Sequence, residues 1–161
     1  NNIAPPKVKV FVWQLIVGRI PTKDNLLNIG LMDSANARCI FGCGEIEDAD
    51  HLFLHCGVIW RIWAKVLGFW GVSSAVPNSL QRWWDVWPFL CPEYRFAEAW
   101  STAFYATVWT IWLERNRLCF NGGSFSEDNI VLTVKLKMGW WLKSRESFAC
   151  LTINDLLRNL K

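Results

Sequence analysis

Apolar side chains recur every three or four residues along most of this sequence, which is the spacing of one face of an α-helix. The first such pattern begins after Pro6 and stops at Gly18 and Pro21, because glycine and proline end helices. The same spacing predicts further helices over residues 22–29, 50–67 (with Gly57 as a candidate break), 79–90 and 94–119, another from Ser126 onward, and a short one over residues 152–160.

The absence of any strand pattern outside these helices favours an all-α fold. No stretch alternates apolar and polar residues at period two, and no repeat of 20 to 50 residues occurs. The sequence therefore predicts an irregular helical bundle that contains one small irregular loop near residues 39–56. A connection rich in Gly, Ser and Pro over residues 71–79 predicts a boundary between a first domain, 1–70, and a second, 71–161.

The composition excludes a disordered chain, because 52% of the residues are apolar and only 19% are charged. Twelve tryptophans and ten phenylalanines at helical spacing are expected to form most of the core. The best candidate for a membrane span, 96–113, contains Glu98 and four serine or threonine side chains, so we expect no helix that crosses a membrane. Because the chain starts at Asn1 and not at a methionine, we expect a processed form or a fragment of a longer protein.

Three of the six cysteines fall within eighteen residues, together with both histidines of the chain. Zinc prefers four tetrahedral ligands drawn from thiolate and imidazole, and a short cysteine pair on a Gly-containing turn presents two sulfurs to one point. Cys39, Cys43, His51 and Cys56 give the spacing C-x3-C-x7-H-x4-C, which predicts a zinc-knuckle-like loop. Four protein ligands leave no open position for water, so the predicted Zn2+ site is structural.

His55 is the competing fourth ligand, since it lies one helical turn after His51. We favour Cys56 over His55 because thiolate is the softer ligand; His55 then supports the site or faces solvent. The alternative interpretation of the whole cluster is buried free thiols and ordinary histidines. The other cysteines lack such grouping, and we expect Cys91, Cys119 and Cys150 to be small core residues.

The sequence carries no recognisable catalytic motif. It has no Gly-rich phosphate loop and no Gly-x-Ser-x-Gly segment, and the paired aspartates of a two-metal polymerase site are missing. Asp48 and Asp50 are close in sequence but lie in an acidic loop. We therefore expect a protein that is not an enzyme.

Three segments together resemble a known family. They are residues 5–13 (PPKVKVFVW), residues 19–22 (RIPT) and the Cys/His run that ends at Ile59-Trp60. Over residues 4–70 they resemble the zinc-binding domain that follows the reverse transcriptase in plant LINE-type (non-LTR) retrotransposon polyproteins. Residues 111–120 (IWLERNRLCF) resemble, less specifically, a helix found downstream in such proteins. The resemblance implies a Zn2+ ion held by Cys39, Cys43, His51 and Cys56.

The resemblance further implies an accessory module of a reverse transcriptase. Its expected partners are RNA or DNA and the reverse transcriptase domain of the same polyprotein, and its expected location is intracellular, in the cytoplasm or nucleus. The alternative is a structural or protein-interaction module that docks onto a neighbouring polymerase or ribonuclease H-like domain, or a decayed copy of the domain.

The charge pattern limits where a nucleic acid can bind. The net charge is only +3, and Glu45, Glu47, Asp48 and Asp50 in the predicted metal loop repel phosphate. Basic residues elsewhere are the better candidates, although they can equally be solvated helix faces. The candidate nucleic-acid-binding residues are Lys7, Lys9, Arg19, Lys23, Arg38, Arg115, Arg117, Lys135 and Lys137.

Overall fold

The computed structural model describes residues 4–143, and this part of the chain folds into helices without a strand. The all-α prediction is confirmed. The α-helices are α1 (Pro6–Ile16), α2 (Lys23–Asn28), α3 (Gly57–Gly68), α4 (Leu80–Val86), α5 (Ala97–Asn121) and α6 (Glu127–Lys143). Short 3-10 turns occupy Ser34–Asn36, Trp87–Leu90 and Tyr94–Phe96, and a π-helical turn spans His51–His55. The helix expected over residues 152–160 lies outside the described residues.

The helix ends follow from local chemistry in the sequence. Thr22 Oγ1 accepts a hydrogen bond from the N–H of Asn25 (3.4 Å) at the start of α2, and Ser79 Oγ accepts one from the N–H of Arg82 (3.1 Å) at the start of α4. Helix α5 ends at Gly122, whose φ of +68° is readily adopted only by glycine. The caps lie at the starts of the predicted helices 22–29 and 79–90, and Gly122 lies close to the predicted end at residue 119.

One predicted helix is divided in two. The segment 50–67 forms the π-helical turn His51–His55 and then α3, because the N–H of Cys56 bonds to the His51 carbonyl (2.9 Å) and Cys56 itself is extended. The chain changes direction at Cys56, which places this side chain at the first turn of α3. The break falls next to Gly57, where the sequence predicts that this helix can be interrupted.

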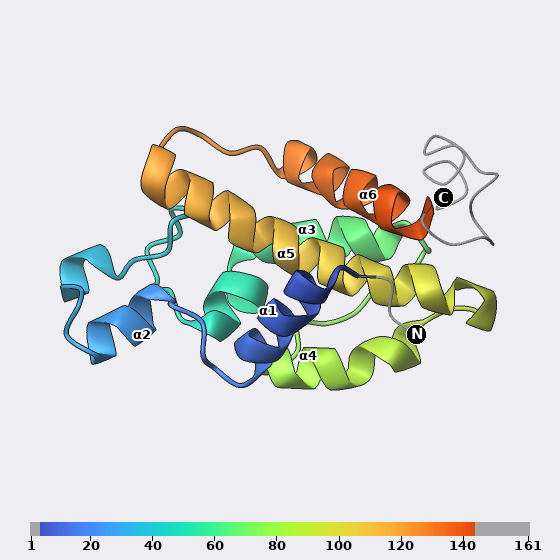
Figure 1. Ribbon diagram of the computed structural model, residues 1–161, viewed down its shortest axis with the longest axis horizontal. Helices are drawn as coiled ribbons and strands as arrows, with labels where there is room; N and C mark the ends of the chain where they lie inside the picture. Colours follow the sequence, from blue (N-terminus) through green and yellow to red (C-terminus); the bar gives the residue numbers. More distant parts are fainter. Residues whose placement is uncertain (1–3, 144–161) are drawn as a thin grey trace.

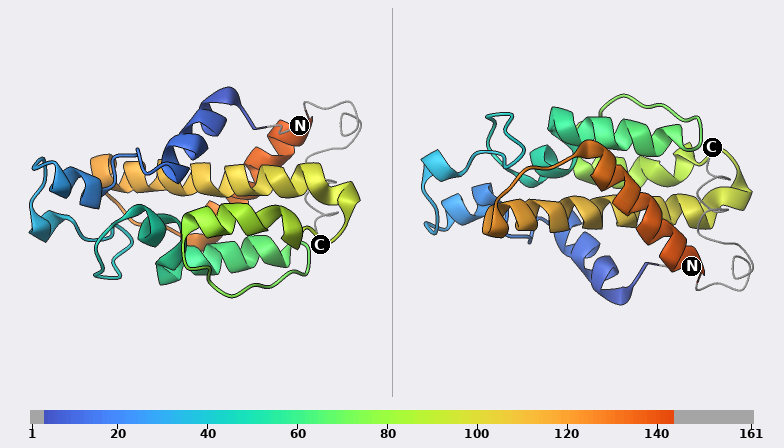
Figure 2. Two further views of the ribbon diagram at one scale, coloured as in Figure 1. Left: turned by 90° about the horizontal axis from the view of Figure 1, so that it is seen from below. Right: turned by 90° about the horizontal axis from the view of Figure 1, so that it is seen from above.

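Helix α5 is the central element of the molecule (Figure 1). Helix α6 crosses one of its faces, while α1 and the pair α3 and α4 lie on opposite sides of it (Figure 2). Because neighbours surround it, α5 buries side chains around most of its circumference. Its buried threonines satisfy their hydroxyls by donating to carbonyls four residues earlier, as Thr107 does to Ala103 (2.8 Å). Within residues 4–143, no helix combines the length and the apolar character that crossing a membrane requires.

Aromatic rings fill the core, as the composition predicts. Ten of the twelve tryptophans are buried or half-buried, and only Trp13 and Trp140 are exposed. Trp87 and Trp100 stack with ring centroids 4.5 Å apart, and each indole N–H donates to the other's backbone carbonyl (2.9 and 2.7 Å). Buried side chains of α1, α3, α4, α5 and α6 form one continuous cluster. The boundary near residue 70 stays a prediction.

Candidate metal centre

The first two candidate ligands lie on a narrow turn. Backbone hydrogen bonds from Cys39 N to Glu45 O (2.8 Å) and from Glu47 N to Ala37 O (2.9 Å) hold the two arms of this turn together. Its tip requires positive φ at Gly42 (+80°), a conformation that costs an L side chain about 1–2 kcal/mol. The turn therefore brings the sulfurs of Cys39 and Cys43 to the same side of the loop.

The other two candidate ligands lie on the π-helical turn and at the start of α3. The His51 N–H donates to Asp48 Oδ1 (2.7 Å), which fixes the beginning of the π-helical turn. Cys56 follows at its end and precedes the first turn of α3. The five-residue spacing between His51 and Cys56 thus places both side chains toward the same point.

The four ligand atoms of Cys39, Cys43, His51 and Cys56 all lie within 4.8 Å of one another. The Cys39 and Cys56 sulfurs are 3.9 Å apart, and the Cys43 sulfur is 3.0 Å from His51 Nε2. Zinc–sulfur bonds of about 2.3 Å in a tetrahedron place two sulfurs about 3.8 Å apart, which matches the Cys39–Cys56 separation. A set of three thiols and one imidazole at this spacing fits zinc.

The thiols of Cys39 and Cys56 differ in acidity. The pKa of Cys56 is lowered to about 5, chiefly because its sulfur accepts a hydrogen bond from the Cys39 thiol and further because the N–H groups of Ile59 and Val58 bond to it. The same thiol–thiol hydrogen bond, together with burial, raises the pKa of Cys39. Cys56 at the start of α3 is thus the better thiolate of the pair, and thiolate is the form that binds metal.

His55, the alternative ligand, lies outside the cluster. Its Nε2 is 3.0 Å from the carbonyl oxygen of Pro77, and its side chain is exposed. The structure thus brings together the four favoured residues and leaves His55 in contact with the 71–79 connection.

We expect the two histidines to respond oppositely to substitution. His51→Ala removes one of four ligands, so the variant should lose its metal on desalting, whereas His55→Ala should retain one equivalent. Metal analysis of both variants, purified without chelators, checks this. Equal metal content in the two variants would contradict the assignment of His51.

The other cysteines differ from the prediction. Both Cys91 and Cys119 are half-buried and not fully buried; Cys91 packs against the edge of the core, and Cys119 lies near the exposed end of α5. Cys150 lies outside the described residues.

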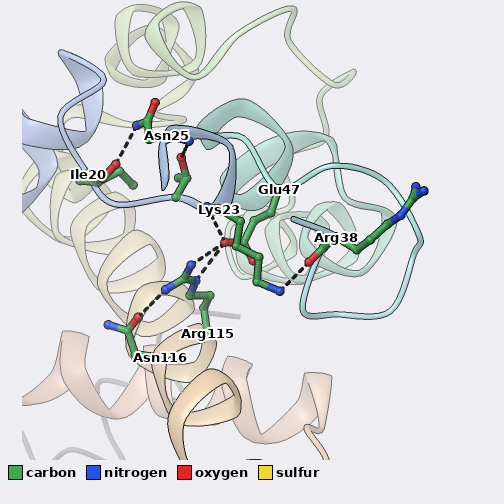
Figure 3. A network of polar contacts seen from close by, with 8 residues as sticks. Ile20, Lys23, Asn25, Arg38, Glu47, Arg115 and Asn116 are labelled. Atoms are coloured by element: carbon green, nitrogen blue, oxygen red, sulfur yellow. Dashed lines mark hydrogen bonds and ion pairs between the residues drawn. The ribbon is translucent and has the colours of Figure 1, made fainter. Parts of the chain in front are cut away.

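A buried ion pair beside the metal loop is the feature that sequence reasoning missed. Glu47 is completely buried, and its Oε1 accepts hydrogen bonds from Arg115 Nη2 (2.7 Å), Arg115 Nε (3.1 Å) and the Lys23 N–H (3.3 Å) (Figure 3). Glu47 is therefore not one of the solvent-facing acids expected in the loop. The helical spacing did indicate that Arg115 is buried, since it lies four residues after Ile111 on the buried face of α5.

Burial removes Arg115 from the candidate nucleic-acid surface: only 5% of it is exposed, and its guanidinium is engaged by Glu47. Two other candidates stabilise the metal loop, because Lys23 Nζ donates to the Arg38 carbonyl (2.6 Å) and Arg38 Nη1 donates to the Gly44 carbonyl (2.6 Å). Arg117 pairs with Glu114 (2.8 Å). The side chains of these four cations thus make contacts within the fold, which leaves them less available to bind a nucleic acid.

The remaining candidates are less constrained. Lys9 and Arg19 are exposed, and the Lys135 ammonium lies over the ring of Phe69 (4.2 Å). Lys7 lies over the ring of Trp109 (5.8 Å), and Lys137 is half-buried on α6; both are considered further below.

Comparison with protein families supports the metal assignment. Residues 1–63 match the family described as zinc-binding in reverse transcriptase. The matched region includes all four side chains of the cluster and ends within α3. It supports the domain type that the sequence predicts for this part of the chain. No curated protein and no solved structure matches the chain.

Proposed function

We propose that the chain is a zinc-stabilised, non-catalytic accessory domain of a reverse transcriptase, from a LINE-type retrotransposon polyprotein of a plant, acting in the cytoplasm or nucleus. The observation that carries the proposal is the convergence of four ligand atoms within the region that matches the zinc-binding family. Because four protein ligands complete the tetrahedron, the metal's role is to hold the loop against the helices. The metal module comprises residues 1–70, and residues 71–161 form its Trp-rich extension.

We propose RNA or DNA as the partner, and the surface of Lys7, Lys137 and Trp109 as the contact. Lys7 of α1 lies over the Trp109 ring of α5. Burial and then the nearby positive charge of Lys7 lower the pKa of Lys137 on α6. Among the ion pairs of residues 4–143, none includes either lysine. A phosphate between the two ammonium groups relieves their repulsion, and the Trp109 ring holds Lys7 at this surface.

We expect the affinity for labelled single-stranded RNA, measured by fluorescence anisotropy, to fall as salt rises. Each phosphate contact to a single strand contributes a slope of about −0.7 in a plot of log affinity against log salt concentration. The double variant Lys7→Ala/Lys137→Ala removes two contacts, so the slope should become less steep by about 1.4.

Arg82→Ala is the matched control, because Arg82 is an exposed cation on α4, away from α6. It should leave the slope unchanged. Salt-independent binding, or equal slopes for the double variant and the control, would refute the proposed surface.

The second candidate function is a module that docks onto a neighbouring polymerase or ribonuclease H-like domain. It is favoured by large exposed rings, since Trp13 on α1 is 57% exposed and Trp140 on α6 is 69% exposed. Exposed aromatic residues of this size are enriched at protein interfaces. Absence of RNA and DNA binding in a folded, metal-loaded protein would favour this function over the first.

A further inference from the structure

A cavity of about 470 Å³ lies between α4, the 3-10 turn that follows it, and α5. It is distant in sequence from the metal ligands and shares no residue with the proposed nucleic-acid surface. Five of its lining residues are aromatic: Trp84, Trp87, Trp100, Phe104 and Tyr105.

The aromatic walls are held in fixed orientations. Trp84 meets Phe104 at 72° and Tyr105 at 84°, with centroids 5.0 and 5.5 Å apart, so the rings around the cavity face different directions. Deeper in, the reciprocal hydrogen bonds of Trp87 and Trp100 fix the stacked indoles. The cavity is thus bounded by preorganised rings and not by flexible side chains.

In the part of the chain that the structure describes, one charged side chain lines this cavity, the carboxylate of Asp85. Asp85 is exposed on α4, and its Oδ1 accepts a hydrogen bond from Gln81 (3.0 Å), which leaves further acceptor capacity on the carboxylate. Among residues 4–143, no lysine or arginine contributes to the lining. Trp87, Trp100 and Phe104 are almost fully buried, so the half-buried rings of Trp84 and Tyr105 are the ones a ligand can reach, next to the one negative charge of Asp85.

We propose that this cavity binds an organic cation, the ammonium or guanidinium group of a basic side chain on a partner protein. Aromatic faces attract such groups through the ring quadrupole, and Asp85 adds an ionic partner at the cavity wall. A nucleotide fits the chemistry less well, because its phosphate would approach Asp85 with no cation in the lining. The same 3-10 turn carries Phe89, which is 86% exposed and can contact the surrounding partner surface.

The test compares choline with 3,3-dimethylbutan-1-ol, a neutral molecule of nearly the same shape. Binding to the full chain is followed by NMR of the tryptophan indole N–H resonances, with the Trp84 resonance assigned from Trp84→Phe. We expect choline to bind about fivefold or more tightly than the neutral alcohol, as cation–π and ionic attraction require. Asp85→Asn should weaken choline binding about fivefold and leave binding of the alcohol unchanged.

Asp33→Asn is the matched control, because Asp33 is an exposed acid beside the metal loop. Equal affinities for choline and the alcohol, no choline binding, or equal effects of the two Asp→Asn variants would overturn the proposal. Tighter binding of uridine monophosphate than of choline at the Trp84 resonance would overturn it in favour of a nucleotide. If Asp85→Asn fails to fold, the comparison of the two ligands on the unmodified chain still decides the question.

Discussion

Replacing Cys43 with serine should abolish zinc binding and strongly destabilise the domain, although the Cys43 side chain is exposed. An exposed side chain without a structural role usually changes the free energy of unfolding by less than about 0.5 kcal/mol. A ligand to structural zinc is different, because metal binding is worth roughly 10–16 kcal/mol in zinc-finger peptides and is coupled to folding. We expect a loss of several kcal/mol, measured by urea unfolding, together with loss of the metal.

Cys119→Ser is the matched control for this experiment. Cys119 is a half-buried thiol near the end of α5 and lies outside the cluster, so its variant should keep one equivalent of metal. A Cys43→Ser variant that is as stable and as metal-loaded as Cys119→Ser would show that Cys43 is an ordinary surface thiol.

Replacing Arg115 with alanine should destabilise the fold by about 3–5 kcal/mol, because it leaves the Glu47 carboxylate buried without its counter-ion. Arg115 exposes 6% of its side chain and Glu47 exposes none, so water cannot replace the lost partner. The Glu47 Oε2 atom already has no hydrogen-bond partner in the described structure, which raises the cost of isolating this carboxylate. Urea unfolding at neutral pH measures the change.

Two further variants show whether the loss arises from the isolated charge. Glu47→Gln/Arg115→Met removes both charges and should recover much of the stability that Arg115→Ala loses. Arg61→Ala breaks the solvent-exposed pair with Glu127 and should have a far smaller effect, because water screens exposed ions. A double variant no more stable than Arg115→Ala would show that the guanidinium acts mainly through packing, such as its contact with the Trp112 ring (5.1 Å).

These two predictions concern the two attachments of one loop. The cluster joins the turn of Cys39 and Cys43 to the start of α3, and the Glu47–Arg115 pair joins the same loop to α5. Between the turn and the π-helical segment, residues 42–51 contribute no fully buried apolar side chain, so polar and metal bonds hold this part of the loop in place. We therefore expect the two attachments to depend on each other.

The helices and the metal ligands were predictable from the sequence because both depend on local spacing. Helical periodicity, the caps at Thr22 and Ser79 and the stop at Gly122 are properties of neighbouring residues. The spacing of Cys39, Cys43, His51 and Cys56 likewise lies within eighteen residues, so the turn and the helix start bring these residues together. Ligand softness favoured Cys56 over His55, and in the structure Cys56 lies in the cluster whereas His55 contacts the Pro77 carbonyl.

Only the tertiary structure decided the pairing of Glu47 with Arg115, since 68 residues separate them and each charge alone resembles a surface residue. The aromatic cavity with Asp85 was also invisible in the sequence, because ring orientations depend on how α4 packs against α5. Helical periodicity indicates whether a side chain is buried or exposed, but the residues that it contacts depend on how helices distant in sequence pack together. For that reason the sequence by itself determined the helices and the ligand set, and the packing around α5 determined which charges are buried and which rings surround a cavity.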